Sequence, residues 1–158
     1  MNVVRSLAGA LAAAVVLALS GGCAPPRSST QAATAENQVA ELQVQDLVVG
    51  QGAEATSGSK VTVHYSGWLY DHAAPDHKGK PFDSSREGGQ PFSFALGARQ
   101  VIVGWDQGVA GMRVGGQRRL VIPSALAYGD QGAGGVIPPM ATLVFDVELL
   151  DVQPAAAR

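Results

Sequence analysis

The feature that most constrains this chain is a series of five short segments in which apolar and polar residues alternate. A period of two places successive side chains on opposite faces of a strand, so each segment predicts a β-strand. Turn-forming residues separate the segments, as Gly50 and Gly52 do after the first. The segments are residues 41–50, 60–70, 91–96, 116–123 and 141–152.

One stretch has the period of a helix instead. Residues 103–112 place Trp105, Val109 and Met112 on one face, although three glycines lower the intrinsic helix propensity. Packing against the sheet must therefore stabilise this helix. Together the patterns predict an α+β fold, a twisted antiparallel sheet of five to six strands wrapped around one short helix.

The N-terminal part of the chain has a different composition. Residues 1–22 carry one charge, Arg5, before a short apolar run, and we expect them to be a signal peptide. Cys23, the only cysteine, follows two glycines, as in bacterial lipoprotein signals whose cysteine is lipidated. The alternative is a plain secretory signal that leaves a free thiol.

The rest of the chain is divided by composition. Residues 23–40 are small and polar and predict a flexible tether, residues 41–152 a single domain, and residues 153–158 a disordered tail. We therefore expect an exported chain that faces the periplasm and is anchored to a bacterial membrane by lipid. In a Gram-negative source this would be the outer membrane.

Composition also excludes several kinds of chemistry. A formal net charge of −2 without a basic stripe argues against nucleic acid as a partner. With Cys23 outside it, the domain has no cysteine for a disulfide, a thiolate nucleophile or a zinc site. His72 and His77 share a charged loop whose spacing fits no zinc pattern, so we expect neither a metal nor another cofactor. No nucleophile has a recognisable base beside it.

Seven of the nine aromatic residues are spread over the predicted segments and the loops between them. They could simply form the core, or they could line a pocket. Strand parity places Tyr65 and Phe145 on the side of the sheet that faces the helix and Trp105. The loop over residues 127–139 would bring Tyr128, together with Val136 and Ile137, beside the start of that helix.

Several motifs in this chain, in the same order, resemble those of the FKBP-type peptidyl-prolyl cis-trans isomerases. They are VTVHYSGWL, PFDSSREGGQPFSFALG, VIVGWDQGVAGMRVGGQRRLVIP, AYG and VIPPMATLVFDVELL, and the resemblance spans residues 44–150. It implies an enzyme that isomerises X–Pro bonds in peptides and unfolded exported proteins and that macrolides such as tacrolimus and rapamycin inhibit. From the sequence we also expect a monomer. An enlarged loop, HAAPDHKG, distinguishes the chain from the smallest family members.

The resemblance also implies the residues of the site. The catalytic group is Tyr65, Asp83, Tyr128 and Phe145. The substrate-binding group is Phe82, Phe92, Phe94, Val101, Ile102, Trp105, Val136 and Ile137.

The implied roles of three groups are specific. Trp105 would lie under the proline ring, the Ile102 backbone N–H would bind the carbonyl that follows proline, and Asp83, held by Tyr65, would face the rotating amide.

An alternative function is a peptide-binding chaperone or surface interaction module with weak catalysis. The complete set of aromatics favours an isomerase, and only nine residues separate Tyr128 from Pro138, too few for a chaperone insert. A dimeric surface factor is disfavoured, because the residues before Glu41 show no apolar heptads.

Overall fold

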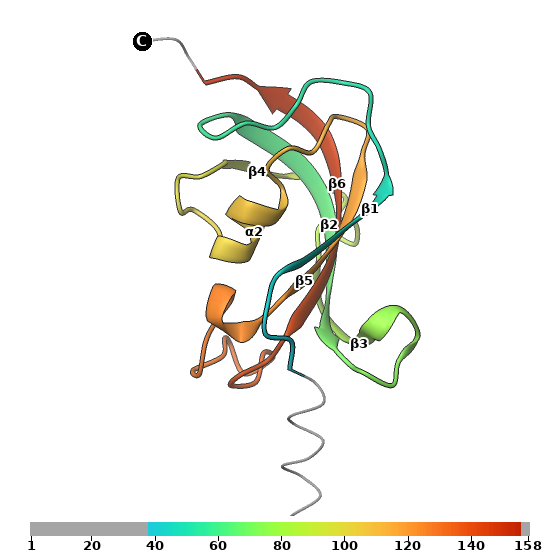
Figure 1. Ribbon diagram of the computed structural model, residues 1–158, viewed down its shortest axis with the longest axis vertical. Coiled ribbons are helices and arrows are strands. Elements are labelled where there is room, and N and C mark those ends of the chain that lie inside the picture. The colour runs from blue at the N-terminus through green and yellow to red at the C-terminus, as the bar shows by residue number, and fades with distance from the viewer. Residues whose placement is uncertain (1–37, 156–158) are drawn as a thin grey trace, which may run out of the picture.

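The computed structural model describes residues 38–155, which form one antiparallel sheet and one short α-helix (Figure 1). The predicted α+β class is confirmed. The predicted signal peptide, Cys23 and most of the predicted tether lie outside the described residues. In chain order the elements are β1 (Gln43–Val48), β2 (Lys60–Tyr70), the 3-10 turn η1 (Pro75–His77), β3 (Lys78–Ser84), β4 (Phe92–Ala95), α2 (Val103–Gly108), β5 (Gln117–Ile122), the 3-10 turn η2 (Ser124–Leu126) and β6 (Leu143–Gln153).

The sheet has the strand order β1-β5-β6-β2-β3, and β4 also pairs with β2. The two longest strands, β2 and β6, pair from Lys60↔Gln153 to Leu69↔Leu143, and both curve past α2 (Figure 1). Val61 and Val63 on β2 are fully buried, whereas Thr62 and His64 between them are partly exposed. The alternation predicted for this strand therefore places the core between the sheet and the helix.

The outer face of the sheet is also partly covered. Val144 is as buried as Leu143 and Phe145 beside it, although parity alone predicts that it faces solvent. Its cross-strand partners are Val121 and Trp68, and the ammonium of Lys78 lies 4.3 Å from the centre of the Trp68 ring. A small apolar cluster on the outer face explains this departure from strict alternation.

Helix α2 is shorter than predicted. It ends at Gly108, and Gly111 adopts a positive φ of 77°, a conformation that a continuing helix cannot accommodate. Trp105, Val109 and Met112 are nevertheless all buried, so the predicted face is correct although the last two residues follow the helix. A Cβ atom on Gly104 would lie 2.3 Å from Cγ2 of Ile122, so the helix axis approaches β5 more closely than any larger residue permits.

Strand β3 was not predicted, because its sequence KGKPFDS contains a proline and does not alternate. It pairs with β2 and forms an edge of the sheet. The enlarged loop before it packs back on the molecule through an ion pair of 3.2 Å between Asp76 and Arg119.

Two structural details bear on the predicted domain boundaries. The backbone N–H of Val39 donates to the Thr142 hydroxyl over 3.1 Å, so the end of the predicted tether already contacts the domain. Gln153 belongs to β6, so it is not part of a disordered tail as predicted. Within residues 38–155, no helix is long and apolar enough to cross a membrane.

Candidate active site

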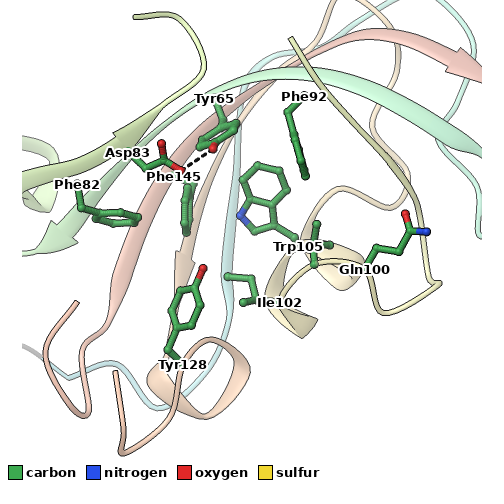
Figure 2. Close-up of a pocket in the computed structure, with 10 residues that line it drawn as sticks. Tyr65, Phe82, Asp83, Phe92, Gln100, Ile102, Trp105, Tyr128 and Phe145 are labelled. Carbon is green, nitrogen blue, oxygen red and sulfur yellow. Dashed lines mark hydrogen bonds between the residues drawn. The ribbon is translucent and has the colours of Figure 1, made fainter. Parts of the chain in front are cut away.

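A cavity of about 210 Å³ opens between the sheet and α2 (Figure 2). Nine of its ten lining residues belong to the set expected from the sequence, and Gln100 is the addition. The lining consists of Tyr65, Phe82, Asp83, Phe92, Gln100, Val101, Ile102, Trp105, Tyr128 and Phe145. These residues come from four strands, the helix and two loops, so only tertiary structure assembles the site.

Trp105 forms the floor of the cavity and is only 4% exposed. Its ring is nearly perpendicular to those of Tyr65 and Phe145, with centroid distances of 5.0 and 5.3 Å. The indole nitrogen has no hydrogen-bonding partner among the described residues. The edge of the indole ring that carries this nitrogen points toward Phe145 (Figure 2). This arrangement suits a weak N–H···π contact and leaves the face of the indole as an apolar surface.

Phe82 and Phe145 form a second side of the cavity, edge to face at 5.5 Å. Gly67 on β2 makes this packing possible, because a Cβ atom there would lie 2.8 Å from both rings. The absence of a side chain at this position is thus a requirement of the site.

A β-bulge aims two consecutive residues at the cavity. Gly67 pairs with Asp83 and Trp68 with Pro81, so Phe82 is an extra residue on β3. In a regular strand Phe82 and Asp83 would face opposite sides, but the bulge turns both toward the cavity. Sequence alternation could not predict this geometry.

The polar side of the cavity is organised by Asp83. The Tyr65 hydroxyl donates to Asp83 Oδ2 over 2.5 Å (Figure 2). Burial raises the pKa of Tyr65 well above its ordinary value, and the hydrogen bond to Asp83 and the negative charge of Asp83 raise it further. Burial and the charge of Asp83 also raise the pKa of Tyr128. Both phenols therefore keep their protons near neutral pH and act as donors.

The loop that leads into α2 is held by two side chains. Asp106 accepts hydrogen bonds from the backbone N–H groups of Gly97 (2.9 Å) and Arg99 (3.2 Å), and Gln100 Oε1 accepts from that of Ala95 (2.9 Å). The Ile102 carbonyl accepts from Trp105 N–H, while the Ile102 N–H has no hydrogen-bonding partner within residues 38–155. The loop therefore presents a free backbone donor at the cavity. No pattern in the sequence marks Gln100 as a residue of the cavity.

Three residues predicted for substrate binding do not line this cavity. Phe94 is 3% exposed and packs beneath Phe92 and Trp105, with centroids 5.7 Å apart in each case. Ile137 is also buried in the core, whereas Val136 is 47% exposed on the loop over residues 127–139. Phe94 thus supports the cavity from behind, and Ile137 belongs to the buried core. A direct role for any of the three stays a prediction.

The described residues offer little for other kinds of chemistry. Within residues 38–155, no group of three or more His, Asp or Glu side chains is arranged to hold a metal ion. The cavity itself contains one carboxylate and two phenols, and its remaining side chains are apolar or amide. It can bind an apolar ring and donate hydrogen bonds around it.

The sheet wrapped around a short helix, with an aromatic cavity between them, defines an FKBP-type domain. Residues 51–150 match the family model of FKBP-type peptidyl-prolyl cis-trans isomerases, and the chain belongs to this family. The predicted family and enzyme class are therefore confirmed: the protein is a peptidyl-prolyl cis-trans isomerase.

Curated relatives and solved structures agree. The FK506-binding protein of Neisseria meningitidis serogroup A is 53% identical over 70% of this chain and 95% of its own length. Peptidyl-prolyl cis-trans isomerase FPR2 of Saccharomyces cerevisiae is 52% identical over 75% of this chain and 80% of its own. AtFKBP13, a solved crystal structure, is 41% identical to this chain in sequence. The similarity has a TM-score of 0.62 and covers 73% of this chain and 96% of AtFKBP13. FkpA from Escherichia coli is 46% identical with the same score, over 72% of this chain and 49% of its own.

Proposed function

We propose that this isomerase accelerates the rotation of X–Pro bonds in exported proteins by holding the proline ring in the cavity over Trp105. The observation that carries the proposal is the cavity itself, which combines six aromatic residues with one carboxylate held by a tyrosine hydroxyl. Its residues match a reaction that needs an apolar surface and positioned donors, and no covalent or metal chemistry.

Rotation of a peptide bond is slow because resonance stabilises the planar amide. The barrier is about 18–20 kcal/mol, and an unaided X–Pro bond needs roughly 10–100 s to rotate. Resonance is lost in the twisted transition state, so the amide becomes less polar. An aromatic cavity from which water is excluded therefore stabilises the twisted amide relative to the planar one. Lowering the barrier by about 7 kcal/mol would accelerate rotation roughly 10⁵-fold.

The polar groups around the cavity would orient the peptide. The free N–H of Ile102 would donate to the carbonyl that follows proline, and the Tyr128 hydroxyl would donate to a second peptide carbonyl. Asp83, fixed by its 2.5 Å hydrogen bond from Tyr65, would face the carbonyl of the rotating bond. Phe82 would contact the residue before proline. None of these roles requires a proton to be transferred.

We also propose that macrolides such as tacrolimus and rapamycin bind in this cavity and compete with peptides. Relatives more than 50% identical are named FK506-binding proteins, and the floor and sides of the cavity present the same kind of aromatic surface to any apolar ring.

The experiment that tests the function is isomerisation of a short Leu-Pro peptide by residues 23–158, with and without rapamycin. We expect rapid turnover that rapamycin abolishes. No acceleration combined with macrolide binding would support the alternative, a peptide-binding chaperone or interaction module. Neither turnover nor binding would mean that the aromatic residues are only a core.

Lipid anchoring through Cys23 is a separate proposal, supported by the sequence of residues 1–23. The full chain should label with palmitate in a bacterial host and sediment with the membranes, and Cys23→Ser should do neither. Export of the wild-type chain without label would support the plain secretory signal. We further propose that the domain is monomeric, which sedimentation equilibrium of residues 23–158 would test.

A further inference from the structure

A second hollow of about 480 Å³ adjoins the cavity over Trp105. Phe82 and Asp83 line both, so a chain that leaves the cavity past Phe82 enters the second hollow directly. Trp68, Pro81 and Glu87 are among its other lining residues. We call this hollow the flanking groove.

The flanking groove carries uncompensated negative charge. Asp83 is hydrogen-bonded only to the neutral Tyr65 hydroxyl, and Glu87 has neither an ion pair nor a side-chain hydrogen bond within residues 38–155. Neither carboxylate is therefore paired with a cation of residues 38–155, although the Lys78 ammonium lies 4.3 Å from the ring of Trp68 in the groove lining.

The neighbouring cations are paired with carboxylates other than Asp83 and Glu87. Lys78 contacts Asp146 over 2.6 Å, Arg119 contacts Asp146 over 2.8 Å, and the guanidinium of Arg86 pairs with Glu148. Both acceptors alternate with the inward-facing Phe145 and Val147 on β6 and so lie on the outer face of the sheet. Arg86 is thereby directed away from Glu87, which follows it in sequence. Lys80, the remaining nearby cation, does not line the groove.

We propose that the flanking groove binds the peptide segment on the N-terminal side of the X–Pro bond and that Glu87 selects a lysine or arginine there. This inference rests on the proposed function, which places the residue before proline against Phe82. An extended peptide advances about 3.3 Å per residue, so the second or third residue before proline lies in the groove. Pro81 and Phe82 in the groove lining offer apolar surface to the methylene groups of a long basic side chain.

The size of the effect follows from exposure. Both Glu87 and the incoming side chain are hydrated at the surface, and such pairs contribute up to about fivefold in affinity. Screening by salt should weaken the preference, since the Debye length shrinks to about 8 Å at physiological ionic strength.

The test compares three peptides with one X–Pro core and alanine, arginine or glutamate two and three residues before the proline. At low salt we expect kcat/KM to be highest for the arginine peptide, about fivefold above the alanine peptide, and lowest for the glutamate peptide, mainly through KM. Glu87→Gln should bring the arginine-to-alanine ratio close to one, and Glu87→Lys should invert it.

Asp151→Asn is the matched control. It removes one exposed negative charge near the C-terminal end of β6, where Asp151 pairs with Thr62 of β2. This variant should leave the arginine-to-alanine ratio of kcat/KM unchanged. Equal kcat/KM for the three peptides, or a preference that persists in Glu87→Gln, would overturn the groove proposal while leaving the isomerase intact.

If no peptide is turned over, the proposed function fails instead. Equilibrium binding of the same three peptides, followed by tryptophan fluorescence, then decides the groove proposal independently: equal affinities overturn it, and a preference for arginine that Glu87→Gln removes supports it.

Discussion

At the scale of single residues, the contact between Tyr65 and Asp83 separates two properties of the cavity. The ring of Tyr65 is part of the apolar lining, whereas its hydroxyl holds the only carboxylate of the cavity in place. Removing the hydroxyl alone therefore tests positioning without removing the aromatic surface.

Tyr65→Phe should lower kcat/KM about tenfold, because a hydrogen bond to a charged group contributes about 1.5–3 kcal/mol and part of it is regained from water. Affinity for rapamycin should change less, since the ring contact with Trp105 remains. Tyr70→Phe is the control, because Tyr70 stacks on His77 and does not line the cavity. Unchanged turnover in Tyr65→Phe would remove Asp83 positioning from the mechanism.

Trp105 provides a direct report of what enters the cavity. The chain has two tryptophans, and Trp68 lies under Lys78 in the flanking groove and does not line the cavity. Trp68→Phe should retain a saturable change in tryptophan emission when rapamycin is added, and Trp105→Phe should lose it. A response that follows Trp68 instead would place the macrolide outside this cavity.

At the scale of elements, the position of α2 depends on its glycines. Gly104 and Gly108 let the helix lie against Ile122 and Leu120. A Cβ atom would lie 2.3 Å from Ile122 if added to Gly104 and 2.6 Å from Leu120 if added to Gly108, closer than side chains can approach. The helix carries Trp105, so the same close approach sets the depth of the cavity.

Gly104→Ala should lower the free energy of unfolding by about 1–2 kcal/mol in urea denaturation. The gain in helix propensity, about 0.5–1 kcal/mol, is smaller than the cost of overpacking against the fully buried Ile122, about 1–3 kcal/mol. Adding Ile122→Ala should cost less in this variant than in the wild type, because it relieves the clash. Gly88→Ala, with nothing within 4 Å, should be neutral, and an equal loss in Gly88→Ala would contradict the explanation.

At the scale of the whole molecule, Asp146 joins parts of the chain that are far apart in sequence. Its carboxylate on β6 accepts hydrogen bonds from Lys78 on β3 and Arg119 on β5, and Arg119 also pairs with Asp76 of the enlarged loop. Burial alone would raise the pKa of Asp146, but the hydrogen bonds and charges of Arg119 and Lys78 outweigh it and hold the pKa below its ordinary value.

A carboxylate whose pKa is lower in the folded state stabilises the protein above its unfolded pKa, about 3.9, and this contribution is lost as pH falls through the folded pKa. Asp146→Asn should therefore lower the free energy of unfolding by about 2 kcal/mol at pH 7, with a smaller difference at pH 3 and below. Asp151→Asn should change little at either pH. A deficit for Asp146→Asn that is constant across this pH range would show that ionisation is not its cause.

Much of the fold could be predicted from local patterns, and the exceptions have physical causes. Alternation identified five strands, because burial of one face imposes a period of two on any strand. It missed β3, where a proline and a bulge interrupt the period, and it overestimated the helix, because Gly111 ends the helical geometry that the pattern Trp105, Val109 and Met112 suggested. It also could not show that Val144 is covered from outside.

The sequence by itself determined the family, the strand pattern and most of the residues around the cavity, since these depend on residue type and order. Tertiary structure alone decided which aromatic rings face the cavity and that Phe94 supports it from behind. It also decided that the bulge aims both Phe82 and Asp83 inward, that the Ile102 N–H is left free, and that Arg86 turns to Glu148 and away from Glu87. Each depends on strand register and on contacts between distant segments, which no local pattern of residues encodes.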